Sequence, residues 1–205
     1  MRIGFLALAA VLVAPVAAFA ADPPIVFQTQ SANRVLGDVR AIVKMVGGEN
    51  AAKQFNEELK AKLGDKGFDG LDVDRPILGY VALAGKIEDT VGVVAIPVTG
   101  EKEFLALIER FGGPKLEAGK NGLYTIPTED EAVKVLMRFD GRHAYIGIGK
   151  DPTAALDPKA LVAPAKLHDP ADKGLASVRV YFDRLPPEIR AQLADGLETT
   201  QDQTG

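Results

Sequence analysis

The aspartates of the loop at residues 64–76 are the most concentrated group of side chains that could do chemistry. Asp69, Asp72 and Asp74 lie close together in this loop, and calcium is bound by several oxygens on a tight loop. Their spacing departs from the EF-hand pattern, and basic residues in the same loop offset part of the charge. We therefore interpret the loop as a solvated turn, with the three aspartates as weak candidate metal ligands.

Two histidines and two further carboxylates are the other candidates. A histidine relay or a zinc site would need His143 or His168 with carboxylates in reach. Both are interpreted as ordinary half-buried or surface side chains. Glu129 and Glu131 could serve glycoside hydrolysis, which needs two carboxyl groups ~5–9 Å apart, but neighbours on a loop tip are typical of a soluble turn.

No nucleophile–base pair or metal-ligand set emerges from the remaining residues. Of the two serines, Ser31 and Ser177, the second lacks the Gly-x-Ser-x-Gly turn of a hydrolase nucleophile. The chain has no cysteine, which excludes disulfides, thiolate catalysis and cysteine-bound zinc. The sequence thus predicts a protein that is not an enzyme and carries no cofactor.

The first twenty residues have the pattern of a secretion signal. Arg2 precedes an apolar run that closes on Ala18-Phe19-Ala20, so we expect cleavage after Ala20 and a periplasmic or extracellular protein. The alternative is an uncleaved N-terminal membrane anchor, since the run approaches the ~20 residues that span a bilayer. Without residues 1–20, 23 basic residues (24 − 1) face 28 acidic ones, a net charge of −5. This balance argues against a nucleic-acid partner.

Apolar periodicity predicts the elements of one domain over residues 31–198. A polar lead, 21–30, is expected to precede it and a frayed tail, 199–205, to follow it. Apolar residues at intervals of three and four predict two helices, from Ser31 to about Val46 and from about Glu49 to Leu63. Because Gly47-Gly48 separates them, we expect a helical hairpin.

The rest of the chain alternates short apolar runs with glycine-rich turns. Strands are predicted at 77–84, 90–98, 123–126 and 177–182, and helices at about 100–111 and from Pro186 onward. The run 177–182 is expected to bury Val178, Val180 and Phe182. The fold class is therefore α+β, with a mostly antiparallel sheet of β-hairpins and helices on one face, preceded by the helical pair.

The strongest local prediction is a hairpin over residues 133–149. With Asp140-Gly141 as its two-residue loop, Phe139 would pair with Arg142, Met137 with Ala144, and Arg138 with His143. The pairing places the apolar residues of both strands on one face.

Several segments together resemble an uncharacterised family of secreted proteins abundant in planctomycete-type bacteria. They are GLDVDRPI at 70–77, IPVTGEKEFL at 96–105, NGLYTI at 121–126, RFDGRHAY at 138–145 and VYFDRLP at 180–186. The resemblance covers about residues 30–197 and implies no activity or site residue.

These observations favour an exported, non-catalytic binding or envelope-associated module. A groove lined by Tyr80, Tyr124, Tyr145 or Tyr181 would support this function. Its partner is expected to be a protein or an envelope component, and self-association through an exposed sheet edge is also expected. The alternative is an exported carboxylate-dependent hydrolase that uses Glu129, Glu131 or the Asp69–Asp74 group.

Overall fold

The computed structural model describes residues 22–84 and 86–191 of the chain. The predicted secretion signal, the frayed tail and the uncleaved-anchor alternative all concern residues outside this part. Among the described residues, no helix is long and apolar enough to cross a membrane.

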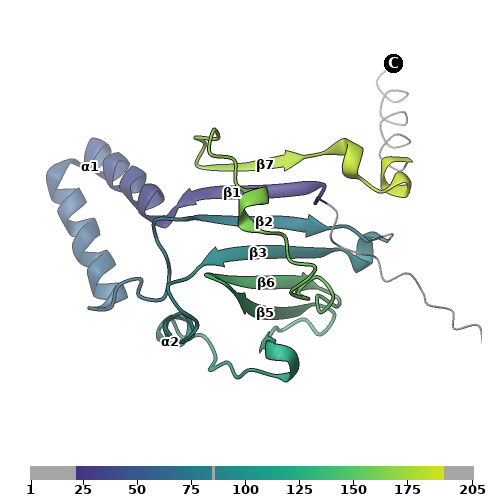
Figure 1. The fold of residues 1–205 in the computed structure, drawn as a ribbon. Helices are drawn as coiled ribbons and strands as arrows, with labels where there is room; N and C mark the ends of the chain where they lie inside the picture. The colour runs from purple at the N-terminus through teal and green to yellow at the C-terminus, as the bar shows by residue number, and fades with distance from the viewer. Residues whose placement is uncertain (1–21, 85, 192–205) are drawn as a thin grey trace, which may run out of the picture.

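Seven antiparallel strands form a single sheet, as the α+β prediction requires (Figure 1). The strand order across the sheet is β4-β5-β6-β3-β2-β1-β7, so β4 and β7 are the edges. The strands are β1 (Ile25–Ser31), β2 (Pro76–Ala82), β3 (Val91–Pro97), β4 (Tyr124–Ile126), β5 (Lys134–Asp140), β6 (His143–Gly149) and β7 (Ala176–Val180). The labelled helices are α1 (Ala32–Leu63), α2 (Glu101–Arg110) and α3 (Pro164–Leu167), with 3₁₀ turns at Ile87–Asp89, Lys120–Gly122 and Phe182–Arg184. Residues 187–191 are also helical, where a helix was predicted from Pro186 onward.

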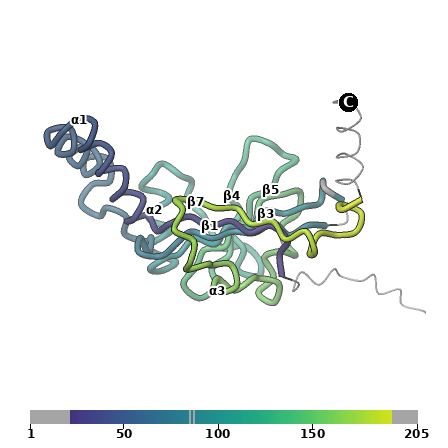
Figure 2. The backbone as a smooth tube through the Cα atoms, turned by 90° about the horizontal axis from the view of Figure 1, so that it is seen from above, coloured from purple at the N-terminus to yellow at the C-terminus, as the bar shows by residue number. Residues whose placement is uncertain are grey.

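Each face of the sheet has its own hydrophobic core. On what we call the loop face, Tyr80, Val93 and Tyr145 pack against the segment 150–174, which contributes Leu156. On the opposite helix face, α2 packs over β3 to β6 in a core that includes Phe104 and Met137. Figure 2 shows the segment with α3 lying on one side of the sheet. The helix-face core contains no residue of β1, β2 or β7, so α2 covers only half of that face.

The expected polar lead is wrong as an element, because residues 25–31 form β1. This strand lies inside the sheet and pairs with both β2 and β7. Its alternation places Val26 and Gln28 on the loop face, where both are buried, and Phe27 on the helix face. A buried glutamine made the segment look polar in sequence.

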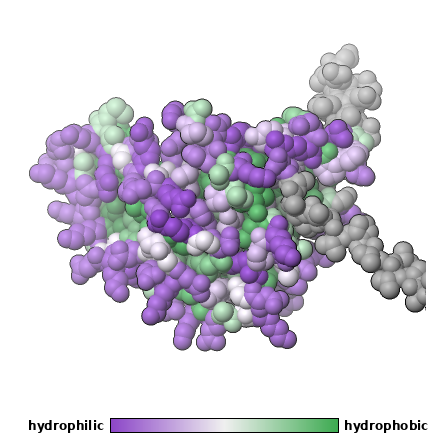
Figure 3. Space-filling model, in the orientation of Figure 1, coloured by the Kyte–Doolittle hydropathy of each residue, from purple (hydrophilic) through white to green (hydrophobic). Residues whose placement is uncertain are grey.

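The predicted helical hairpin is confirmed as the two arms of α1. The helix bends at Gly48, whose φ of 74° and ψ of −174° break the helical path, and the Ser31 side chain caps its N-terminus. Arg40 Nε donates to Asn56 Oδ1 across the arms at 2.8 Å. The hairpin projects beyond one end of the sheet (Figures 1 and 2). Its outer end exposes Met45 and Val46. In Figure 3, apolar surface is visible among the polar side chains at the α1 end of the molecule.

The β5–β6 hairpin is confirmed, but its predicted pairing is off by two residues. The loop is Gly141-Arg142, so Phe139 pairs with Ala144 and Asp140 with His143. Gly141 has a φ of 55°, which fits a turn with glycine as its first central residue. The prediction of which side chains lie on the same face is still correct, because a register shift of two residues leaves every side chain on its original face.

The predicted orientation of the last strand is wrong. Val178 and Phe182 are 68% and 67% exposed, and Val180 is exposed as well. Arg179 instead turns to the loop face, where it bonds to Asp169. The strand alternates as expected, but the polar row is the one that meets the segment 150–174. An apolar row therefore remains open on the edge strand.

Candidate functional site

The two histidines, which are far apart in sequence, meet in one pocket on the loop face. The pocket has a volume of about 190 Å³. Its lining residues are Arg75, Pro76, Leu78, His143, Pro164, Ala165 and His168. Three cationic or ionisable side chains thus share a small cavity with apolar walls. We call it the histidine pocket.

Three different elements position the polar side chains of the histidine pocket. His143 is the first residue of β6 and follows directly on the hairpin loop. Arg75 directly precedes β2, and His168 directly follows the single turn of α3. Because β2 and β6 both flank β3, the start of each lies near the other at one end of the sheet.

His143 is the most enclosed polar group of the histidine pocket, at 7% exposure. Burial lowers the pKa of His143, and the Arg75 guanidinium lowers it further. Asp72 and Asp140 act in the opposite direction and Arg142 in the same direction as Arg75. Among the described residues, neither the imidazole of His143 nor the guanidinium of Arg75 has a hydrogen-bond or ion-pair partner. Both groups are therefore available to a ligand.

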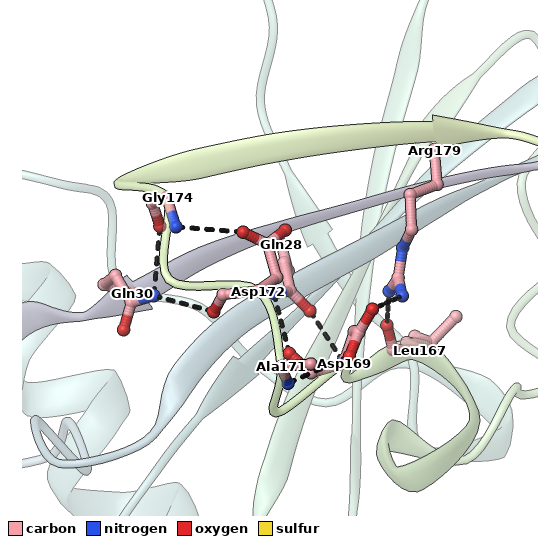
Figure 4. Close-up of polar contacts among 8 residues, drawn as sticks. All are labelled: Gln28, Gln30, Leu167, Asp169, Ala171, Asp172, Gly174 and Arg179. Carbon is pink, nitrogen blue, oxygen red and sulfur yellow. Dashed lines mark hydrogen bonds and ion pairs between the residues drawn. The ribbon is translucent and has the colours of Figure 1, made fainter.

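A polar network fixes the segment that carries His168 (Figure 4). Gln28 of β1 exchanges two hydrogen bonds with the backbone of Asp169: its Nε2 donates to the carbonyl at 3.2 Å, and its Oε1 accepts from the N–H at 2.8 Å. Arg179 of β7 donates to Asp169 Oδ2 at 3.0 Å and also to the Leu167 carbonyl. The residues on both sides of His168 are thus tied to the sheet.

Replacing Gln28 with alanine is expected to lower the free energy of unfolding by about 1–3 kcal/mol. Gln28 is 4% exposed, so its loss leaves the N–H and carbonyl of Asp169 without partners in a partly buried place. The matched control is Gln30→Ala, because Gln30 also bonds to backbone carbonyls, at Asp172 and Gly174, but at a more exposed site. Urea unfolding of both variants measures the difference. Equal losses of unfolding free energy in the two variants would show that the contacts of Gln28 contribute no more to stability than those of Gln30.

The candidate calcium ligands do not converge. Asp72 forms an ion pair with Arg142 at 3.0 Å, and Asp74 accepts a hydrogen bond from Asn33 at 2.6 Å. Asp69 lines a separate hollow of about 500 Å³ together with Glu103. Within residues 22–84 and 86–191, no three His, Asp or Glu side chains are grouped to hold a metal ion. The described part of the chain therefore offers the calcium hypothesis no ligand set.

The other predicted site residues are also separated from the histidine pocket. Glu129 and Glu131 are exposed in the loop between β4 and β5, where Asp130 accepts a hydrogen bond from the Ala132 N–H. The four tyrosines do not line one groove. Tyr80 and Tyr145 are buried in the loop-face core, Tyr181 packs partly buried against the same core, and Tyr124 is buried near α2 on the other face. Donation of a hydrogen bond to Glu101 raises the pKa of Tyr124 to about 12. The tyrosine rings therefore pack in or against the two hydrophobic cores and do not form a binding surface.

No pattern in the sequence indicated Arg75 as a site residue, because the three polar groups of the pocket come from separate segments of the chain. Comparisons with models of protein families, with curated proteins and with solved structures found no match to this chain. The resemblance to a secreted family thus rests only on the quoted segments.

Proposed function

We propose that the protein is an exported, non-catalytic binding module and that its ligand is a small aliphatic carboxylate held in the histidine pocket. One observation carries the proposal: the buried imidazole of His143 lines a cavity beside the Arg75 guanidinium, and neither group has a protein partner in the described residues. The nitrogen atoms of His143 and Arg75 are not among the fully buried unpartnered atoms of the described residues, so they face the open space of the pocket, where a ligand can pair with them.

The charge of the pocket selects an anion. Arg75 has the strongest effect of any charged group on the pKa of His143, so the potential at the imidazole is dominated by a cation. Asp72, the carboxylate that most opposes Arg75 in its effect on the pKa of His143, forms an ion pair with Arg142. A planar guanidinium binds a carboxylate through two parallel hydrogen bonds, and an imidazole N–H can supply a further one.

The walls of the pocket select the rest of the ligand. Pro76, Leu78, Pro164 and Ala165 are apolar, and they favour a short aliphatic chain over an inorganic anion. A volume of about 190 Å³ is below the range of drug-sized sites and fits a molecule of a few heavy atoms. An exported module with this pocket would capture small organic acids outside the cytoplasm.

Butyrate is expected to bind saturably in the pocket and to shift the NMR signals of both imidazole rings. With only two histidines in the chain, both C2–H signals can be followed without labelling. Butyrate should bind more tightly than acetate, by about fourfold for each CH₂ that the walls bury. Binding should strengthen as the pH falls, because a bound anion stabilises the imidazolium form, and the pKa of His143, which burial and Arg75 lower in the free protein, should rise with butyrate present.

The variant that tests the pocket is Arg75→Gln, which should weaken butyrate binding at least tenfold. Its matched control is Arg110→Gln, which removes the same charge from a guanidinium that bonds to the Gly67 carbonyl near another hollow. Equal butyrate affinities of the wild type and Arg75→Gln would refute the proposal that butyrate binds in the histidine pocket. Tighter binding of phosphate than of butyrate would refute the carboxylate ligand.

The alternative function, an exported carboxylate-dependent hydrolase, has weaker support. Asp69 and Glu103 line the same hollow, as two catalytic carboxyl groups must. An adjoining hollow, lined by the same two residues, is also lined by Lys66, Lys102 and Arg110, so cations surround the pair. We therefore place the binding function first.

A further inference from the structure

The free edge of the sheet at β7 is built to pair with another strand. In the described part of the chain, β7 has β1 on one side and no strand on the other (Figure 1). The Leu175 carbonyl accepts from Gln30 N–H, and the Tyr181 N–H donates to the Pro24 carbonyl, so residues 175 and 181 face β1. By alternation, the backbone groups of Ala176, Val178 and Val180 point outward.

The two edges of the sheet differ in how they are protected. The opposite edge, β4, has three residues, is followed by Pro127, and has Tyr124 bridged to Ala118. Short strands, prolines and covering segments are the devices that keep natural edges from pairing. β7 is longer, with five residues; no proline lies between Gly174 and Phe182, no strand of the described residues pairs with its outer side, and its exposed row is apolar.

The charge on β7 is compatible with a second copy of itself. Arg179 is the single charged residue of the strand, and its guanidinium turns to the loop face, where it bonds to Asp169 and Leu167. Like charges facing each other across a strand pair would oppose pairing, and here the outward-facing residues carry no charge. The edge therefore has no electrostatic barrier to a copy of the same strand.

We infer that two copies of the chain associate through an antiparallel β7–β7 pair, with a two-fold axis at Val178. In this register Val178 faces the partner's Val178, and Ala176 faces the partner's Val180. All three outward-facing residues then form hydrogen-bonded pairs, with about six hydrogen bonds between the chains. Ser177 faces the partner's Arg179, so no two guanidinium groups are opposed. Such a contact is isologous and closes as a dimer.

The two exposed valines add a hydrophobic contribution to the pairing. Val178 and Val180 lie on the helix face, in the half that α2 leaves uncovered, and each opposes a β1 residue there, Phe27 and Ile25. Across the two-fold axis, the Val178 side chains of both copies become direct cross-strand neighbours. β-branched side chains in this position stabilise strand pairs.

The test is sedimentation velocity of the protein purified after export, compared with its Val178→Lys variant. The wild type should dimerise as its concentration rises, and the variant should weaken the dimer at least tenfold because two ammonium groups would face each other. The matched control is Val46→Lys, which makes the same change at an exposed residue of the α1 hairpin and should leave dimerisation unchanged. Thermal unfolding confirms that both variants fold.

Hydrogen exchange identifies the contact itself. The amides of Val178 and Val180 should be protected in the dimer and should exchange rapidly at dilutions where the chain is monomeric. A wild type that stays monomeric at millimolar concentration would overturn the inference. So would a dimer that persists in Val178→Lys, or a dimer whose Val178 amide exchanges as fast as in the monomer.

Discussion

Replacing Gly70 with alanine is expected to lower the free energy of unfolding by at least about 3 kcal/mol. Gly70 has a φ of 108°, which side chains rarely adopt, and an added Cβ would lie 2.5 Å from the Glu103 carbonyl oxygen and 2.9 Å from the Phe104 Cα. Both atoms belong to the backbone of α2 and cannot rotate away. Backbone strain and overpacking each cost about 1–3 kcal/mol, and here they act together.

The Gly70→Ala substitution is also expected to weaken ligand binding in the histidine pocket. The Gly70 carbonyl accepts from Thr99, and the Asp72 N–H donates to the Pro97 carbonyl, so this loop is fastened to the end of β3. Arg75 follows in the same loop. If the loop moves off α2, we expect butyrate affinity to fall together with stability.

The matched control for Gly70 is Gly67→Ala, three positions earlier in the same loop. Gly67 also has a positive φ, 52°, but nothing lies within 4 Å of an added Cβ. Its substitution should cost only the strain of the left-handed conformation, about 1 kcal/mol. Urea unfolding of both variants measures the two costs. Similar losses would show that the approach of Gly70 to α2 contributes nothing.

Local patterns were enough to predict most of the elements. The helical hairpin follows from apolar spacing and from the glycines that separate its arms, and Gly48 is the position where the helix bends. The β5–β6 hairpin follows from a turn signal between alternating runs. In both cases the information lies in neighbouring residues, because helix and turn geometry depend on short-range contacts.

The errors arose where long-range contacts decide the structure. β1 contains two glutamines, and only the return of the segment 150–174 provides the partners that let Gln28 be buried. The same segment draws Arg179 to the loop face and leaves Val178 exposed. Hydrophobicity alone predicts the opposite orientation for β7, because it takes no account of an ion pair with Asp169.

The histidine pocket was beyond prediction for a related reason. His143 was expected to face Arg138, and the actual register places Asp140 opposite it instead. His168 lies in a segment with little regular structure, and its place depends on the contacts of Leu167 and Asp169 with the sheet. A pocket built from three separate segments requires the sheet order, which one sequence does not supply.

The half of the helix face without α2 needs another cover, and the Phe27 ring provides part of it. Phe27 on β1 faces Gly79 on β2, and its ring lies over the glycine: an added Cβ at position 79 would be 1.8 Å from Phe27 Cζ. The missing side chain thus makes room for the ring, which shields the backbone of a strand that α2 does not reach.

Gly79→Ala is therefore expected to destabilise the wild type by about 2 kcal/mol, because the ring must leave its position. In a Phe27→Ala background the same change should be neutral or slightly stabilising, since alanine is favoured over glycine within a strand. The coupling energy in this double-mutant cycle should approach about 2 kcal/mol.

Gly92→Ala is the matched control for this cycle. Gly92 lies on the same face of the adjacent strand β3, opposite Val81, and nothing lies within 4 Å of an added Cβ. Its substitution should be neutral or stabilising by several tenths of a kcal/mol in both backgrounds. If Gly79→Ala lowers the free energy of unfolding equally in the wild type and in Phe27→Ala, the glycine is not needed to make room for the Phe27 ring. The open half of the helix face would then be held together by the β1–β2 backbone pairing alone.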